Sequence, residues 1–469
     1  MNRRNGQVVK KILIQLLCFG FPLFILLMPA DWMPLAFNVV EKRLIAIFFF
    51  AALCWILEPI PIHATSIMII LLELFLISDA GIQQIKPREG ILLDYKAVLA
   101  TFASPIIMLF LGGFFLAKAA QKYRLDLNLA RILLKPFGTI PRWVMMGLMI
   151  ITALFSMFMS NTATTVMMLS ILVPILGTLP KEDRGRTALA LSIPFAANIG
   201  GVGTPIGTPP NAIALKYLTG ENQIGFGEWM GFAVPYAVVL LIIAWGLLIT
   251  LFPFESKSIE LKIRSKWLKT TKAKIVYITF IVTILLWLTD FWHGMNAYVV
   301  AILPVAVFLA TNVINTEDMK KLSWDILWLV SGGIALGYGL EKSGLAVHLV
   351  ASIPFDQMPV TMVLIGMSLL AMVMANFMSN TATANLLLPI VAALAVTLPG
   401  ISAWGGSGAM ILGVALASSM GMALPISTPP NALAHATGET RTNDMSKVGI
   451  LVGVIGLAMI IGLLWLMAL

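Results

Sequence analysis

Two short polar motifs, each present twice, contain the residues best suited to bind a small ligand. Met-Ser-Asn-Thr-Ala-Thr occupies Met159–Thr164 and returns at Met378–Thr383. Thr-Pro-Pro-Asn occupies Thr208–Asn211 and returns at Thr428–Asn431. Hydroxyl and amide groups can donate to a carboxylate, and their oxygens can coordinate an alkali cation. The motifs therefore predict a binding site for small ions.

The two motifs belong to a longer internal repeat with an offset of about 220 residues. Gly112-Gly113 matches Gly332-Gly333, and Trp55-x-x-Glu58 resembles Trp287-x-x-Asp290. Four features recur in the same order with nearly constant spacing. The chain is thus built from two related halves.

The composition indicates a helical membrane protein. Of 469 residues, 59% are hydrophobic and only 11% are charged, so the bilayer is the natural solvent. Long apolar runs approach the roughly 20 residues that cross the hydrocarbon core. The clearest are Ile12–Met28, Leu44–Leu57, Phe232–Leu251, Ile275–Leu288, Tyr298–Leu309 and Val448–Leu469. We expect an all-α polytopic fold with about 11 transmembrane helices and two re-entrant hairpins.

The distribution of basic residues predicts that the halves have opposite orientations. The first half has six basic residues between Lys118 and Arg142, whereas the equivalent stretch from Tyr338 to Thr361 has only Lys342. Basic loops favour the cytoplasm, so equivalent segments lie on opposite faces, as in the inverted repeats of secondary transporters. The same rule predicts a cytoplasmic amino terminus, and the expected location is a bacterial-type inner (plasma) membrane.

This reading divides the chain into four parts. A basic segment with the first transmembrane helix covers residues 1–39, and it resembles a signal peptide without a cleavage site. The first inverted repeat covers 40–256, with a re-entrant hairpin at 141–179 and a broken helix at 186–216. A cytoplasmic basic linker covers 257–274. The second repeat covers 275–469, with a hairpin at 359–398 and a broken helix at 405–436.

The polar breaks of the two halves should meet near the middle of the membrane. Each Ser-Asn-Thr precedes a helical arm, and a helix amino end attracts a carboxylate. Two such ends facing each other suit a dicarboxylate. Neither the tripeptides nor the stretches 198–211 and 418–431 contain Lys or Arg. Cations must therefore accompany the dianion, and exposed carbonyls with the amides of Asn161 and Asn380 suit sodium.

Other interpretations of these features are less favoured. Ser-Asn-Thr can pack membrane helices, Thr-Pro-Pro-Asn can form a plain kink, and the glycine pairs fit close helix packing. Proton coupling needs an ionisable group in the membrane, but Glu58, Glu73 and Asp290 lie near predicted helix ends, away from the breaks. His435 alone among four histidines lies near the second break, where a structural role is favoured.

Function classes other than transport are also less favoured. A channel would line its pore about a symmetry axis, and the catalytic motifs of intramembrane enzymes are absent from the sequence. The net charge of +9 lies in short loops, which argues against nucleic acid as a partner. Cys18 and Cys54 lack metal-ligand spacing, so no cofactor is expected apart from sodium as a coupling ion.

From about Arg43 to the carboxyl end, these motifs make the chain resemble the divalent anion:sodium symporter family, the INDY-type dicarboxylate transporters. The resemblance implies symport of C4 dicarboxylates such as succinate, malate or fumarate with sodium. It also implies a homodimer in which a transport region slides past a scaffold like an elevator. Relatives of this kind include sodium-independent dicarboxylate exchangers and carriers of citrate or sulfate, and these alternatives stay open.

The resemblance also assigns residues by motif. The substrate would be held by Ser160, Asn161, Thr162, Ser379, Asn380, Thr381, Thr208, Pro209, Thr428 and Pro429. One sodium ion would bind Ser156, Ser160, Asn161 and Gly207, and a second would bind Ala375, Met378, Asn380 and Ser427. Symporters of this family tend to have a hydroxyl residue at the position of Ala375, so a weaker second site is expected.

Overall fold

The structure of the chain is a computed structural model, which describes residues 12–29, 32–33, 35, 37–259, 266–352 and 358–468. Within these ranges the chain forms helices and connecting loops, and its β-type pairing is limited to an isolated bridge between Ser78 and Leu93. The expected all-α fold class is confirmed. The basic residues before the first helix and part of the expected linker, at 260–265, lie outside the described residues.

Six helical stretches of the described chain are long and apolar enough to cross a membrane. They are α5–α6 (Tyr95–Lys122, with a 3-10 turn at Thr101–Ala103), α12 (Phe226–Leu251), α13 (Thr271–Leu288), α20 (Val360–Phe377), α21 (Asn380–Thr397) and α24 (Thr442–Ala468). The polytopic interpretation is therefore confirmed, while the number of crossings stays a prediction.

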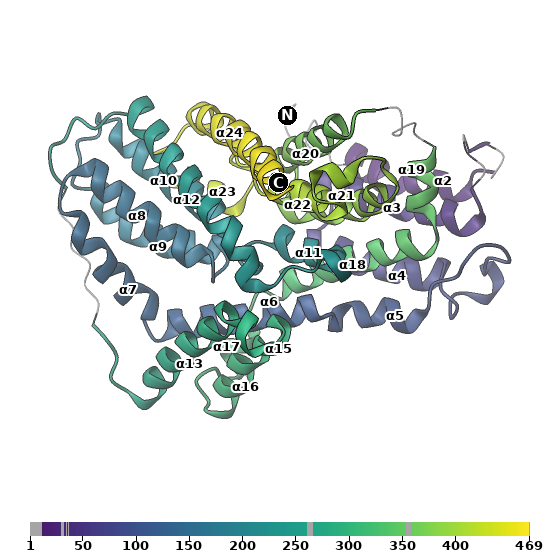
Figure 1. Ribbon diagram of the computed structural model, residues 1–469, viewed down its shortest axis with the longest axis horizontal. Helices are drawn as coiled ribbons and strands as arrows, with labels where there is room; N and C mark the ends of the chain where they lie inside the picture. The colour runs from purple at the N-terminus through teal and green to yellow at the C-terminus, as the bar shows by residue number, and fades with distance from the viewer. Residues whose placement is uncertain are drawn as a thin grey trace.

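The remaining helices of the described chain fall into two groups. The apolar ones are Ile12–Leu27 (including α2, Phe21–Leu27), α4 (Ile62–Leu76), α8 (Pro141–Ser156), α9 (Asn161–Leu176), α15–α16 (Ala297–Ala310) and α22 (Ser407–Ser418). The others are α3 (Val39–Leu57), α7 (Leu125–Leu134), α10 (Gly185–Gly201), α11 (Pro209–Tyr217), α14 (Asp290–His293), α17 (Thr316–Lys320), α18 (Trp324–Lys342), α19 (Leu345–Ala351) and α23 (Pro429–Ala436). Figure 1 shows α7–α10 at one end of an elongated body and α2, α3 and α19 at the other.

The paired tryptophans make matching contacts in the two halves. Trp55 in α3 and Trp287 in α13 are both fully buried. Each indole N–H donates to a backbone carbonyl at the start of the following apolar helix, Ile62 O at 3.2 Å and Ala297 O at 3.1 Å. The similarity between these two sequence positions is thus also a similarity of structure.

The paired glycines allow close helix packing, and they do so across the halves. A Cβ atom at Gly112 of α6 would lie 2.2 Å from Ala301 O, beside α16. A Cβ atom at Gly332 of α18 would lie 2.4 Å from the Cβ atom of Ser66 in α4. Each glycine helix therefore packs against an apolar helix of the other half, in agreement with the packing role favoured from the sequence.

The helices that follow the two breaks also exchange partners between halves. α11 packs against α21 and α22, whereas α23 packs against α9 and α10. A side-chain ion pair strengthens the second contact, because the Arg186 guanidinium at the start of α10 binds the Glu439 carboxylate just after α23. The four breaks expected to form a site are consequently held by helices that interlock.

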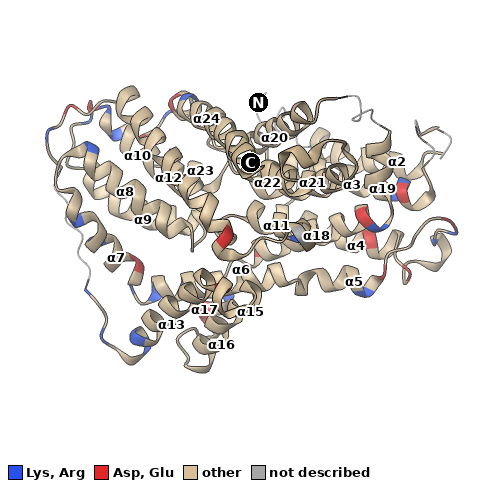
Figure 2. Cartoon of the chain, in the orientation of Figure 1, with Lys and Arg blue, Asp and Glu red and all other residues tan. Residues whose placement is uncertain are grey.

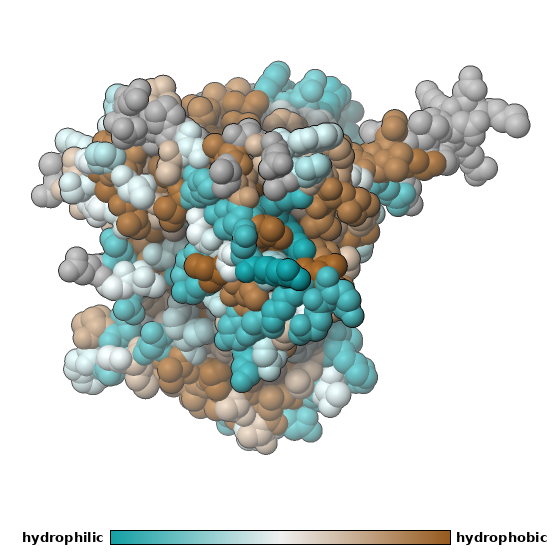
Figure 3. Space-filling view, turned by 90° about the vertical axis from the view of Figure 1, so that its right-hand side faces the viewer, coloured by the Kyte–Doolittle hydropathy of each residue, from teal (hydrophilic) through white to brown (hydrophobic). Residues whose placement is uncertain are grey.

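Charged residues lie mainly in loops and at helix ends, as Figure 2 shows. The end of the molecule on the right of Figure 1 has a hydrophilic centre between hydrophobic areas above and below, as seen in Figure 3. Many large apolar side chains on the outer helices are exposed, among them Ile278, Val299 and Met362, each more than 60% accessible. Such surfaces suit contact with lipid.

Candidate functional site

The first Ser-Asn-Thr motif lies at the amino end of α9. Ser160 is the N-cap, with an extended backbone (φ −61°, ψ 140°), and its Oγ accepts a hydrogen bond from Ala163 N at 3.2 Å. The first intrahelical bond runs from Thr164 N to Ser160 O, so the N–H groups of Asn161 and Thr162 lie ahead of it. The half-buried motif therefore presents free donors at the positive end of a helix dipole.

A cluster of oxygen atoms surrounds Asn161. Ser156 Oγ lies 2.6 Å from Asn161 Oδ1 and 2.8 Å from Ala197 O, but a hydroxyl has only one proton to share between these acceptors. Gly201 adjoins the same place, since a Cβ atom there would lie 2.6 Å from Asn161 Oδ1 and 3.1 Å from Gly207 O. The structure thus brings Ser156, Asn161 and Gly207 together, with more oxygen atoms than protons.

The second motif repeats the cap at the amino end of α21. Ser379 has φ −65° and ψ 145°, and its Oγ accepts from Ala382 N at 3.1 Å. Asn380 Oδ1 is buried without a hydrogen-bond partner in the described chain, and Thr381 is buried beside it. The amide oxygen of Asn380 is therefore available for a ligand. Within the described residues no hydrogen bond joins the two tripeptides directly.

The expected second cation site differs from the first. Ala375 has no side-chain oxygen and packs against Gly421. A Cβ atom added at Gly421 would lie 2.4 Å from the Cβ atom of Ala375. Met378 is buried, and Ser427 Oγ donates to Asn376 O at 2.9 Å. The structure thus directs the hydroxyl of Ser427 toward Asn376 rather than toward an oxygen cluster like that of Asn161.

The asparagines that end the Thr-Pro-Pro-Asn motifs hold the breaks in shape. Asn211 Nδ2 lies 2.8 to 3.2 Å from the carbonyl oxygens of Gly201, Val202 and Thr204. Asn431 Nδ2 bonds the carbonyls of Met422 and Leu424 at 2.8 and 3.0 Å. We call each of these sets of bonds, from Asn211 or Asn431 to the carbonyls of the break before it, a clamp. This role was not assigned from the sequence, although an asparagine at the fourth position of both motif copies could have indicated it.

Asn198 is a second residue that the sequence reasoning did not single out. It lies in α10 of the first half, and its Nδ2 is 3.2 Å from both Thr428 Oγ1 and Asn431 Oδ1 of the second half. Thr208 and Thr428 are the N-caps of α11 and α23, which Pro209 and Pro429 begin. The second break is therefore bonded to the first half close to the cluster around Asn161.

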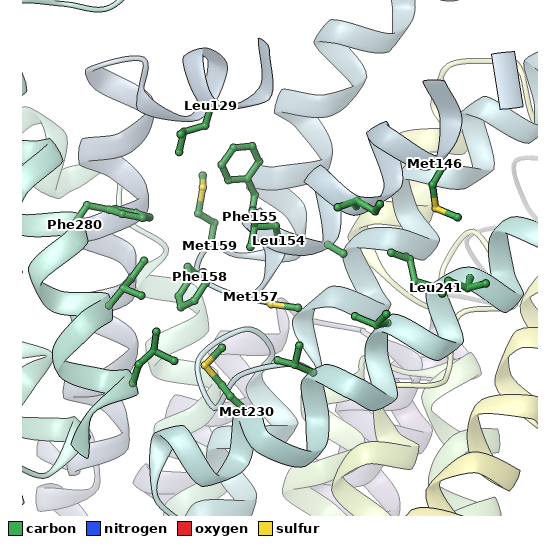
Figure 4. Close-up of a pocket in the computed structure, with 17 residues that line it drawn as sticks. Leu129, Met146, Leu154, Phe155, Met157, Phe158, Met159, Met230, Leu241 and Phe280 are labelled. Carbon is green, nitrogen blue, oxygen red and sulfur yellow. The ribbon is translucent and has the colours of Figure 1, made fainter. Parts of the chain in front are cut away.

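A cavity next to the first motif is apolar. It has a volume of about 690 Å³, and its lining includes Met157, Phe158 and Met159 at the turn between α8 and α9. Figure 4 shows these side chains grouped with Met230 of α12 and Phe280 of α13 around the space. A dianion would find no donors there, so this cavity is a poor substrate site.

The acidic residues considered for proton coupling have different surroundings. Glu58 is the C-cap of α3, and Asp290 accepts a hydrogen bond from Phe226 N at 2.8 Å. Glu73 lies in the last turn of α4, as expected from the sequence, and its side chain is fully buried. His435 Nδ1 lies 3.4 Å from Thr440 Oγ1, which is consistent with its expected structural role.

Comparisons with known proteins were made for the whole chain. Residues 9–469 match the family described as "Sodium:sulfate symporter transmembrane region". The chain is 32% identical to the sodium-dependent dicarboxylate transporter SdcS of Staphylococcus saprophyticus, over 97% of this chain and 90% of that one. It is 29% identical to the sodium-dependent high-affinity dicarboxylate transporter 3 of Caenorhabditis elegans, over 87% of this chain and 80% of the other.

A solved structure with a similar fold is that of the YdaH transporter of Alcanivorax borkumensis. The TM-score is 0.54 at 14% sequence identity, and the match covers 86% of this chain and 98% of that chain. At this identity the likeness concerns the fold alone.

Proposed function

The chain belongs to the family of the sodium:sulfate symporter transmembrane region, and from this premise we propose that it is a secondary transporter that carries C4 dicarboxylates together with sodium ions. Succinate, malate and fumarate are the expected substrates. The sodium-dependent dicarboxylate transporters to which the chain is similar support this substrate class.

The observation that carries the proposal is the cluster around Asn161. Ser156 Oγ lies within 2.8 Å of two other oxygen atoms, Asn161 Oδ1 and Ala197 O. The Ser156 hydroxyl has only one proton to share between these two acceptors. A bound cation relieves the repulsion between such oxygens, and sodium prefers ligands of this type. We assign the first sodium ion to Ser156, Ser160, Asn161 and Gly207.

The substrate is proposed to lie between the amino ends of α9 and α21. Ser160, Asn161 and Thr162 would bind one carboxylate, and Ser379, Asn380 and Thr381 the other, through hydroxyl, amide and backbone donors. Thr208-Pro209 and Thr428-Pro429 would line the same pocket. The matching cap geometries of Ser160 and Ser379 support two equivalent half-sites.

The movement is proposed to follow from the interlocked helices. The halves would be inverted repeats with the hairpins α8–α9 and α20–α21 entering from opposite faces, and the amino terminus would be cytoplasmic. The region that contains α8–α11 and α20–α23 would slide as an elevator past a scaffold that forms a homodimer. α11 and α23 favour joint movement, because each packs against the hairpin arm of the opposite half.

Sodium-independent exchange of dicarboxylates is a second candidate, and one observation favours it. Ala375 replaces the hydroxyl that Ser156 supplies in the first half, and Ser427 is already bonded to Asn376. The second sodium site, proposed at Ala375, Met378, Asn380 and Ser427, therefore depends on backbone carbonyls and on Asn380 Oδ1.

Uptake of radiolabelled succinate into proteoliposomes decides between the two. Symport predicts that succinate accumulates when an inward sodium gradient is present, and that internal dicarboxylate is not needed. Exchange predicts uptake only into liposomes loaded with succinate, whether or not sodium is present. Uptake in neither condition would refute transport of C4 dicarboxylates.

A further inference from the structure

Glu73 lies in a place where a carboxylic acid is far more stable than a carboxylate. Its side chain is fully buried near the end of α4, and neither Oε1 nor Oε2 has a hydrogen-bond partner in the described chain. The Glu73 carboxyl group packs against Gly339 of α18, where a Cβ atom would lie 2.6 Å from Oε1, so only a residue without a side chain leaves room for it. An ionised carboxylate without donors costs several kcal/mol to bury, so the site suits a group that holds a proton.

Lys216 is a basic residue of α11, the helix that follows the first break, and it bonds the same helix, α18, against which Glu73 packs. It lies in α11, which Thr208 caps, and its Nζ donates to Ile334 O of α18 at 3.0 Å. Gly337 of α18 makes room for the amine, because a Cβ atom there would lie 3.1 Å from Nζ. The charge of Lys216 acts on Glu73 across α18.

Lys216 also borders a cavity whose wall has both apolar and polar side chains, whereas Glu73 does not. The cavity has a volume of about 810 Å³ and reaches Pro205 of the first break, with Thr219 and Gln223 on its wall. Water in this space can contact Lys216, whereas Glu73 is fully buried and does not line the cavity. Lys216 thus borders the cavity, and its charge acts on the buried acid.

The other charged groups near the pair are already engaged or exposed. On α11, the Tyr217 phenol lies against Gly337; on α18, Glu341 is exposed, pairs with Lys342 and also acts through its charge on Lys216. Arg43 of α3 donates to Leu76 O at 2.6 Å. Lys96 of α5 is exposed, and the cavity carboxylates of Asp290 and Glu228 accept from the backbone N–H groups of Phe226 and Gly225.

We propose that Glu73 is a proton-binding site that is filled from this cavity through Lys216, and that the proton takes part in the transport cycle. When movement of α11 brings the two groups within hydrogen-bond distance, the Lys216 ammonium gives a proton to the Glu73 carboxylate, and the resulting amine takes one proton from the solution through water in the cavity. The net change is one proton bound. This role rests on the proposed function, because movement of α11 during transport would change the distance between Lys216 and Glu73.

Infrared spectroscopy of the purified full chain tests the site without reference to transport. The wild-type protein should show, at neutral pH, the carbonyl stretching band of a protonated carboxylic acid, and Glu73→Gln should lose it. Glu317→Gln is the matched control, since Glu317 is a carboxylate of α17 whose side chain is 68% exposed and paired with Lys320, and it should keep the band. A band that is absent from the wild type, or unchanged in Glu73→Gln, overturns the proposal.

Fumarate uptake into proteoliposomes tests the part in the cycle. Both of its carboxyl groups are ionised between about pH 6 and about pH 8, so the substrate does not change charge. Wild-type and Glu317→Gln uptake should fall several-fold over this range as protons become scarce, while any uptake by Glu73→Gln should not vary with pH. Equal pH profiles of wild type and Glu73→Gln would refute the coupling. Absence of uptake in every preparation would refute the proposed function and leave the spectra to decide on Glu73.

Discussion

Single residues account for the difference between the two half-sites. Ser160 and Ser379 cap their helices with nearly the same backbone angles. Ser156 adds a hydroxyl to the first half, whereas Ala375 adds a methyl group that packs on Gly421. A site with fewer oxygen ligands holds a hard cation less tightly. The first half should therefore provide the stronger sodium site.

Asn161→Ala and Asn380→Ala should each reduce succinate uptake by about tenfold or more, while folded protein stays in the membrane. Asn161→Ala removes the amide oxygen next to Ser156, and Asn380→Ala removes an amide oxygen that has no hydrogen-bond partner in the described chain and is therefore available to a ligand. A lost hydrogen bond to a charged ligand costs about 1.5–3 kcal/mol, which corresponds to this factor. Initial rates in proteoliposomes measure the effect. Asn315→Ala, in the cap of α17, is the control and should leave the rate unchanged. Full uptake in both site variants would remove Asn161 and Asn380 from the site.

At the scale of elements, the breaks depend on one clamp in each half. Between α10 and α11, and between α22 and α23, backbone carbonyls lack the partners that a continuous helix would supply. Asn211 and Asn431 bond these carbonyls from the first turn of the next helix. The prolines ahead of them start α11 and α23 without needing a backbone donor. The breaks are thus stable structures rather than frayed helix ends.

Asn431→Ala should lower the free energy of unfolding by about 1–3 kcal/mol, because its two carbonyl acceptors become unsatisfied in a buried place. Asn211→Ala should have an effect of the same size. Thermal unfolding of the purified protein, followed by tryptophan fluorescence, measures the loss as a lower Tm. Asn222→Ala serves as the comparison, since within the described residues the half-buried Asn222 side chain makes one bond, to Ser407 Oγ. An unchanged Tm in Asn211→Ala and Asn431→Ala would show that the clamps do not stabilise the breaks.

At the scale of the whole molecule, contacts between distant segments hold the two halves together. Arg186 joins α10 to the turn after α23, and Thr187 Oγ1 adds a bond to Glu439 O at 3.0 Å. Asp183, in the turn before α10, binds the segment after α12 through the backbone N–H groups of Glu255 and Ser256 and the Ser256 hydroxyl. One end of the molecule is thus fastened by polar bonds at loop ends, while its interior is mostly apolar.

Asp183 should make stability depend on pH. Burial raises the pKa of Asp183, but hydrogen bonds from Ser256, Gly185 and Glu255 together lower it by more. The net pKa therefore lies below its usual value. The unfolded chain then binds the proton more readily, and stability is present above the unfolded value of about 3.9 and is lost as the pH falls through the folded value.

Asp183→Asn should therefore lower Tm at neutral pH, by the equivalent of about 1–3 kcal/mol. The difference from the wild type should shrink below about pH 4. Glu182→Gln, an exposed neighbour, should match the wild type at every pH. A constant gap between Asp183→Asn and the wild type across the pH range would contradict the assigned cause.

The sequence by itself determined the class of fold, the family and the positions of the motifs. Length and apolarity of the runs require helices in a bilayer, since only helices and closed barrels satisfy the backbone there and a barrel would show alternating segments of about 10 residues. Repeated motifs place Ser160, Ser379 and the two Thr-Pro-Pro-Asn segments at helix starts, because serine, threonine and proline favour those positions. These features depend on local chemistry, which the order of residues contains.

Only the tertiary structure decided which segments meet. The bonds from Asn198 to Thr428 and Asn431, the oxygens gathered around Asn161, and the approach of Lys216 to α18 join residues far apart in the chain or in different helices. The burial of Glu73 depends on Gly339 of α18, which no pattern within α4 specifies. Such contacts follow from the packing of whole helices, and packing depends on the shapes of both partners rather than on either sequence segment alone.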